Sequence, residues 1–177
     1  MRRIKQVLPK EAYYNNEWFE EEKAKIFEKE WQFVGMVEDI KEEKSYLLKS
    51  IGNTPIAVVR NEGQLYAFVN LCRHRGLTLL RGDEKLGSTI ACPYHNWNYT
   101  LDGKLKGIPQ SKEFEGMDRA CMGLKKVQCE IWNGLIFVNL DLEAQSLKEV
   151  LDPIQNRILP YDDMDELKFN DGYSYII

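Results

Sequence analysis

From residue 31 onward, short apolar runs rich in β-branched and aromatic residues are separated by polar turn residues, a texture typical of strands. The runs occupy residues 31–35, 45–51, 54–60, 64–70, 88–93, 97–100, 127–132 and 134–140. The sequences NEG, LDGK and WNG stand between runs, where hairpins place such residues. This pattern predicts a small, mostly β domain of antiparallel strands over residues 31–142.

A helical segment is expected on each side of this domain. In residues 1–30, Asn16 is placed to cap a helix with an acidic first turn. The apolar stripe of this helix contains Trp18, Phe19, Ile26 and Phe27. In residues 143–177, Ser146 and Glu149 have the spacing of a capping box, which predicts a short helix. An acidic loop and one strand are expected to follow that helix.

Composition narrows the class of protein. The chain has 177 residues, of which 44% are hydrophobic, enough for one globular domain with a sizeable core. A net charge of −4 argues against nucleic acid as a partner. The basic first residues lack the apolar run of a signal peptide, and no stretch approaches the roughly 18 apolar residues of a membrane span. We therefore expect a soluble cytoplasmic protein that binds no membrane, whose four cysteines are metal ligands or core residues.

Both histidines of the chain lie beside cysteines, in the pattern Cys72-x-His74-x17-Cys92-x-x-His95. Each pair follows a predicted strand, so a β scaffold can hold the two loops tip to tip. Two thiols and two imidazoles suit either a tetrahedral zinc ion or a Rieske [2Fe–2S] cluster, in which two Cys bind one iron and two His the other. The interleaved order, with one Cys and one His in each loop, favours the two-iron cluster.

The stretches CRHRG and CPYHNWNYTLDGKL resemble the Rieske signature of ring-hydroxylating oxygenase α subunits, and IFEKEWQFVG and IWNGLIFVNLD resemble its flanks. The resemblance implies a Rieske-type antiparallel β-sandwich with a small cluster-binding subdomain, an N-terminal helix and a short C-terminal helix. It also implies that Cys72 and Cys92 bind one iron, and His74 and His95 the other. Asn96 stands where the family usually has Gly, and Asn tolerates a left-handed backbone well.

Residues beside the ligands are expected to tune and protect the cluster. We expect Arg75, Tyr94, Trp97 and Tyr99 to shield it. Trp97 stands where respiratory Rieske proteins carry a Ser that donates to a sulfide. Fewer hydrogen bonds to sulfur predict a potential at the low end of the Rieske range. The two remaining cysteines, Cys121 and Cys129, are expected to be small, partly buried structural side chains.

The resemblance implies an electron-transfer module of an aromatic-ring-hydroxylating mono- or dioxygenase. Single electrons would pass from a reductase or ferredoxin to a mononuclear Fe(II) in a catalytic domain of the same or a neighbouring subunit, commonly in a homotrimer. That iron needs two His and a carboxylate, and the cluster takes both histidines of this chain. We therefore expect no catalytic residue here, and either a fragment or one half of a split enzyme. The alternatives are a free-standing Rieske ferredoxin and a zinc-stapled structural module.

Overall fold

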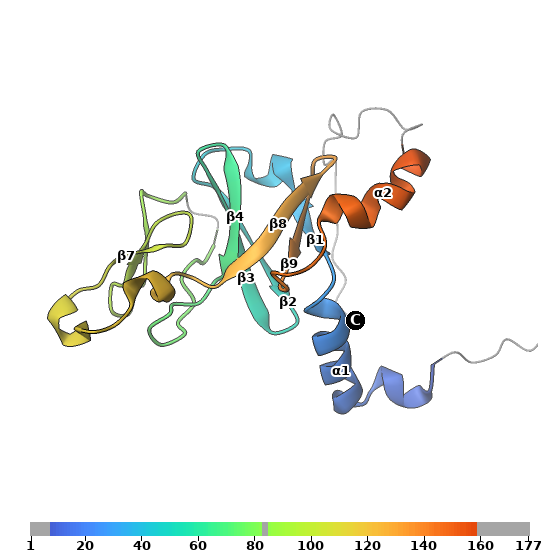
Figure 1. The fold of residues 1–177 in the computed structure, drawn as a ribbon, viewed down its shortest axis with the longest axis horizontal. Helices are drawn as coiled ribbons and strands as arrows, with labels where there is room; N and C mark the ends of the chain where they lie inside the picture. Colours follow the sequence, from blue (N-terminus) through green and yellow to red (C-terminus); the bar gives the residue numbers. More distant parts are fainter. Residues whose placement is uncertain (1–7, 83–84, 159–177) are drawn as a thin grey trace, which may run out of the picture.

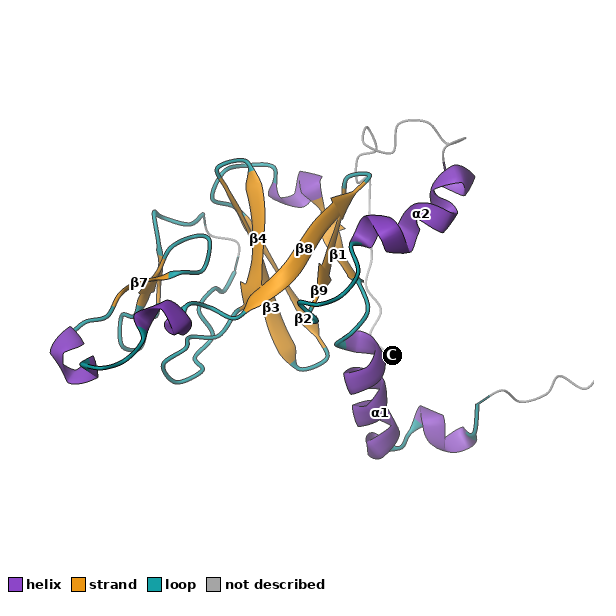
Figure 2. Ribbon diagram, in the orientation of Figure 1, coloured by secondary structure: helices purple, strands orange, loops and turns teal. Residues whose placement is uncertain are grey.

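A six-stranded antiparallel sheet forms most of the protein in the computed structural model, which describes residues 8–82 and 85–158 (Figures 1 and 2). Its strands follow the order β1-β9-β8-β4-β3-β2, and β1 also contacts β2, so the sheet is nearly closed. The strands are β1 (Gln32–Met36), β2 (Tyr46–Ile51), β3 (Thr54–Asn61), β4 (Gln64–Val69), β8 (Lys126–Trp132) and β9 (Leu135–Asn139). The predicted mostly β, antiparallel fold is confirmed.

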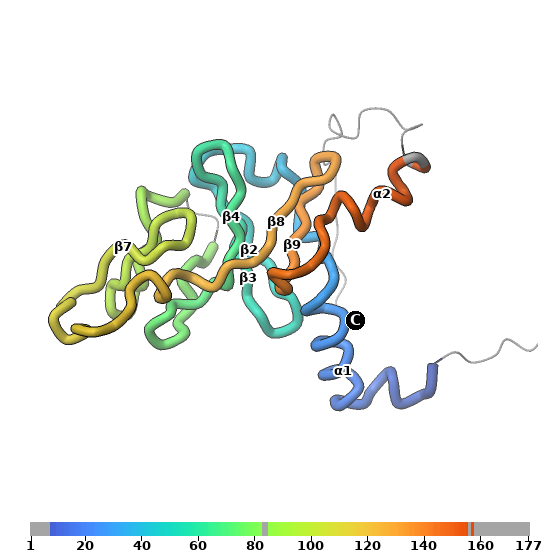
Figure 3. The backbone as a smooth tube through the Cα atoms, viewed as in Figure 1, coloured from blue at the N-terminus to red at the C-terminus, as the bar shows by residue number. Residues whose placement is uncertain are grey.

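The segment between β4 and β8 leaves this sheet and forms a small subdomain at one end of the molecule (Figure 3). It contains a three-stranded antiparallel sheet and two 3₁₀ turns. These elements are β5 (Ile90–Ala91), β6 (Asn98–Tyr99), β7 (Leu105–Gly107), η4 (Ser111–Phe114) and η5 (Arg119–Met122). The sequence pattern did not predict β7, which has only three residues and pairs with β6 after the expected turn at Gly103.

Strand β3 is buried on both of its faces and joins two hydrophobic cores. Ile56 and Val58 point into the core enclosed by the six-stranded sheet, whereas Ala57 and Val59 belong to the core of the small subdomain. Successive side chains of a strand point to opposite faces, so a strand that packs on both sides must be apolar throughout. This explains why residues 56–59 form an unbroken apolar run in the sequence.

The two flanking helical segments form where they were expected. The side chain of Asn15, rather than Asn16, caps α1 (Asn16–Glu22), with its Oδ1 2.7 Å from the Glu17 backbone nitrogen. Other short helical elements are η1 (Lys10–Tyr13), η2 (Lys23–Phe27) and η3 (Val37–Ile40). Within the predicted stripe Phe27 packs against the core, but Phe19 and Ile26 are exposed.

The capping box predicted at Ser146 is confirmed at the start of α2 (Leu147–Ile158). The backbone nitrogen of Ser146 donates to Glu149 Oε2 over 3.2 Å, and that of Glu149 donates to Ser146 Oγ over 3.3 Å. The acidic loop and final strand expected after this helix lie outside the described residues. Within the described ranges, no helix combines the length and apolar character needed to cross a bilayer.

Candidate metal centre

The two Cys/His loops have the same backbone structure. The backbone nitrogen of Cys72 donates to Leu77 O and that of Cys92 to Trp97 O, each over 2.8 Å. Four residues after each Cys, the backbone nitrogen donates back to that Cys oxygen over 2.9 Å. The residue at that position is left-handed in both loops, with φ +70° at Gly76 and +55° at Asn96. Asn96 therefore adopts the backbone for which Gly is normally used.

This shared geometry places the candidate ligands in two pairs, one of thiols and one of imidazoles. The rings of His74 and His95 lie 4.6 Å apart between centroids, at 69°. Cys72 and Cys92 are both buried, and the neighbouring Cys92 thiol contributes to the raised pKa of Cys72. A two-iron cluster with two Cys on one iron and two His on the other needs such a division into pairs.

Buried polar atoms show that these residues fit a metal cluster. His74 Nδ1 is buried without a hydrogen-bond partner, a costly state for a ring nitrogen unless a metal ion or another ligand satisfies it. Burial, the nearby His95 and the charge of Arg75 all lower the pKa of His74, which keeps the imidazole in its neutral, metal-binding form. Burial also raises the pKa of the Cys72 thiol, so a cation is needed to hold it as a thiolate.

Aromatic side chains surround the imidazole pair. Trp97 is buried and stacks on His74, with centroids 5.0 Å apart and planes within 2°. The ring of Phe114, from η4, meets His74 edge-on at 6.1 Å and was not singled out in the sequence. Tyr94 lies over His95 with centroids 3.7 Å apart, although 59% of Tyr94 is exposed. Arg75 is exposed.

Tyr99 is fully buried on β6 and contacts the thiol side of the site. Its hydroxyl oxygen accepts a hydrogen bond from the backbone nitrogen of Arg73 over 3.0 Å and lies 3.3 Å from Cys72 Sγ. Burial, followed by the contact with Cys72, raises the pKa of Tyr99, so the phenol stays protonated. Its proton can then be donated to a sulfur, a contact that reasoning from the sequence missed because it depends on the packing of β6 against the first loop.

The other two cysteines lie outside this centre. Cys129, on β8, is partly buried as expected, and burial raises the pKa of its thiol to about 12. Cys121 differs from the expectation because it is exposed, in η5, with its Sγ 3.0 Å from Asp118 Oδ2. This contact raises the pKa of Cys121. Among the described residues, no three His, Cys, Asp or Glu side chains converge on a single-ion site.

The Rieske [2Fe–2S] domain family matches residues 30–129, which include both Cys/His loops. The chain belongs to this family. Two proteins with similar sequences are oxygenase subunits. The α subunit of 2-aminobenzenesulfonate 2,3-dioxygenase from Alcaligenes sp. is 37% identical over 148 residues, which is 81% of this chain and 38% of the relative. The oxygenase subunit of glycine betaine monooxygenase from Pseudomonas aeruginosa is 35% identical over 158 residues, 88% of this chain and 36% of the relative.

Solved structures with a similar fold are also oxygenases. A quaternary ammonium Rieske monooxygenase in its apo form superposes with a TM-score of 0.82 at 30% identity, over 87% of this chain and 45% of that one. Naphthalene 1,2-dioxygenase with indole bound superposes with a TM-score of 0.72 at 31% identity, over 79% of this chain and 32% of that one. The chain thus spans less than half the length of these relatives. The expected [2Fe–2S] cofactor and Rieske fold are confirmed by these matches.

Proposed function

We propose that the chain is the electron-transfer module of a Rieske-type oxygenase α subunit. It would pass single electrons from a ferredoxin or reductase to a mononuclear iron that it does not itself hold. Two of its relatives are named for chemically unlike substrates, an aromatic sulfonate and glycine betaine, yet both align with this segment. A segment common to both supports the step that such enzymes share, electron delivery, rather than the choice of substrate.

The proposed ligands are Cys72 and Cys92 for one iron and His74 and His95 for the other. The observation that carries this assignment is the pair of twin loops, which groups two thiols and two imidazoles and leaves His74 Nδ1 without a protein partner. When bound, a [2Fe–2S] cluster takes up and releases one electron at a time. The protein holds the four side chains on short, hydrogen-bonded loops, which limits how far they move when the charge changes.

The surrounding side chains have proposed roles in keeping water from the ligands. Buried Trp97 and Tyr99 cover the site from the small-subdomain core, and Tyr94 covers His95 from the solvent side. A dry surrounding strengthens the hydrogen bonds and charges that set a reduction potential. Arg75 is exposed, so its proposed contribution is positive charge near His74 rather than cover.

We also propose that the chain alone does not oxygenate a substrate. A mononuclear iron site of two His and one carboxylate would need histidines beyond the two in this chain. The site would belong to a catalytic domain of the same or a neighbouring subunit, in a homotrimer. The division into segments 1–30, 31–142 and 143–177 stays a prediction, supported by the strands lying between Gln32 and Asn139. The cytoplasmic location likewise stays a prediction.

The test is the metal and sulfide content of anaerobically purified protein, with an EPR spectrum after reduction. We expect two irons and two acid-labile sulfides per chain and a rhombic signal of low average g. The variant Cys92→Ser should lose them, whereas Cys129→Ser, a matched change outside the loops, should keep them. One zinc per chain without sulfide would refute the proposal.

A second variant tests the proposed role of each ligand. His95→Cys should retain a cluster but lower its potential, because a thiolate replaces a neutral imidazole and adds negative charge. An unchanged potential in a loaded variant would contradict the assignment of His95. Electron transfer to an added catalytic domain distinguishes the two functions. An oxygenase module should reduce that domain rapidly, whereas a free-standing ferredoxin should reduce unrelated acceptors equally well.

A further inference from the structure

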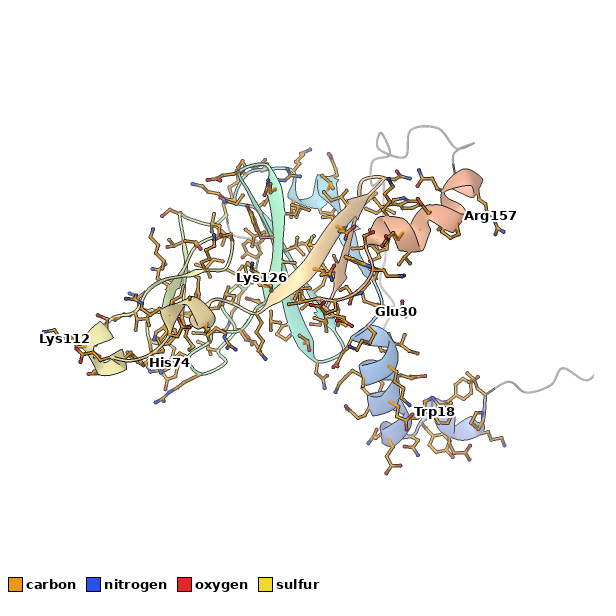
Figure 4. All side chains as sticks on the ribbon, viewed as in Figure 1. Trp18, Glu30, His74, Lys112, Lys126 and Arg157 are labelled. Atoms are coloured by element: carbon orange, nitrogen blue, oxygen red, sulfur yellow. The ribbon has the colours of Figure 1, made fainter. Side chains whose placement is uncertain are left out.

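A basic pocket lies where the small subdomain meets the large sheet. Its volume is about 590 Å³, and it is formed by the turn after β6, by η5 and by the start of β8. Five of the residues that line it are cationic, and none of its described lining residues is acidic. The basic pocket is defined by Arg73, Lys104, Arg119, Lys125 and Lys126. Figure 4 shows Lys126 between the sheet and the subdomain that carries His74.

Among the described residues, most of this positive charge has no carboxylate within ion-pair distance. Lys104 is the exception, because its Nζ lies 2.7 Å from Asp102 Oδ2. Arg119, Lys125 and Lys126 are exposed, and the described residues supply no ion pair to any of them. The protein as a whole carries a net charge of −4, so the basic pocket is a positively charged region on a negatively charged protein.

The inner wall of the basic pocket reaches the cluster loops. Arg73 lines the pocket and lies between two proposed ligands, Cys72 and His74. Its backbone nitrogen is held by the hydroxyl of Tyr99, and its side-chain Nε is buried without an acceptor. Arg73 therefore brings a positive charge to the inner wall of the basic pocket. An anion in the basic pocket would therefore lie near Arg73, the immediate chain neighbour of Cys72 and His74.

We propose that the basic pocket is the docking site for carboxylate side chains on the acidic face of the electron-donor protein. The inference rests on the proposed electron-transfer function and names the surface that its donor uses. Charge complementarity favours an acidic protein, because three exposed cations along the rim can steer a whole charged face and Arg73 adds positive charge at the inner wall. In the transfer, the donor loses one electron and the cluster gains it, with no bond formed or broken.

The test uses the cluster-loaded chain and a strongly acidic plant-type [2Fe–2S] ferredoxin as the probe. Such ferredoxins have potentials below the Rieske range, so transfer to this chain is downhill. The pocket variant combines Arg119→Glu, Lys125→Glu and Lys126→Glu. Its matched control combines Lys10→Glu, Lys49→Glu and Lys148→Glu, which changes three exposed side chains away from the pocket and alters net charge equally. Binding of the oxidised ferredoxin is measured by calorimetry and electron transfer by stopped flow.

We expect the second-order rate constant of the pocket variant to fall about 10- to 100-fold at low ionic strength, with weaker binding and a flatter dependence on salt. The control variant should change by less than about threefold. Equal losses in the two variants, or wild-type rates that do not fall as salt is added, would overturn the docking site.

Photoreduction by neutral deazaflavin separates this inference from the function on which it rests. Equal photoreduction of all three proteins shows that the clusters are intact, so an effect confined to ferredoxin identifies docking. A wild-type chain that cannot be reduced by either route would refute the proposed function itself. If the pocket variant fails to load its cluster, the single variant Lys125→Glu replaces it. We expect Lys125→Glu to slow electron transfer from ferredoxin several-fold, and an unchanged rate would overturn the proposal.

Discussion

The hydroxyl of Tyr99 should raise the reduction potential of the cluster, and Tyr99→Phe should therefore lower it. The hydroxyl oxygen already accepts a hydrogen bond from the Arg73 backbone nitrogen, so its proton is available for Cys72 Sγ, 3.3 Å away. As a proposed cluster ligand, Cys72 would carry no proton on its sulfur, which makes the phenol the donor. Reduction adds negative charge to the cluster, and a donor to a sulfur stabilises the more negative state more strongly.

The size of the effect follows from the energy of the contact. A hydrogen bond to a charged group contributes about 1.5–3 kcal/mol, and only the difference between the two redox states affects the potential. If that difference is about 1 kcal/mol, a one-electron couple moves by roughly 40 mV, since a tenfold change in equilibrium constant corresponds to about 59 mV. Phe keeps the aromatic ring at this fully buried position, so the substitution removes only the hydroxyl, with its contact to Cys72 Sγ and its hydrogen bond from the Arg73 backbone nitrogen.

Protein-film voltammetry of the wild type and Tyr99→Phe at one pH measures this shift. The matched control is Tyr66→Phe, because the Tyr66 hydroxyl donates to Gln64 Oε1 over 3.0 Å, on β4 rather than on a cluster loop. We expect a fall of about 40 mV in the first variant and no shift in the second. An unchanged or higher potential in a fully loaded Tyr99→Phe protein would refute the reasoning.

Three further predictions concern the scaffold. Asn96→Ala should destabilise the protein by about 1 kcal/mol, because Ala tolerates φ +55° poorly, whereas Asn96→Gly should be nearly neutral in urea unfolding. Ser146→Ala removes half of the capping box and should weaken the first turn of α2 by about 1 kcal/mol, seen as roughly fivefold faster amide exchange there. Lys29, 2.9 Å from Asp141, holds the pKa of that carboxyl below its usual value. This contribution is therefore present above about pH 4 and lost as the pH falls through the lowered pKa, so the deficit of Asp141→Asn in urea unfolding at pH 6 should vanish near pH 2.

Local signals in the sequence were sufficient for the strands of the large sheet and for the two flanking helices. Turn residues such as Asn133 and Gly134 adopt the positive φ that hairpins need, and the capping box at Ser146 forms as its spacing predicts. Asn96 also has a positive φ, a backbone conformation that Asn tolerates well. These features depend on a few neighbouring residues, whose preferences are nearly independent of the rest of the fold.

Features that depend on contacts between distant segments could not be predicted in the same way. The hydrogen bond of Tyr99 to the first loop joins residues 27 positions apart. The basic pocket is lined by both Arg73, in the first cluster loop, and Lys126, at the start of β8. These residues are far apart in the sequence, and no local motif connects them. The capping residue of α1 was misplaced by one position, because Asn15 and Asn16 have equal side chains and only the path of the backbone distinguishes them.

The two-sided packing of β3 has a consequence for how the protein comes apart. Ala57 and Val59 belong to one core and Ile56 and Val58 to the other, so neither core can open without removing a wall of its neighbour. Denaturation should therefore be a single cooperative transition that releases iron as the large sheet melts. A transplant of the cluster loops into another scaffold would have to carry this strand with them.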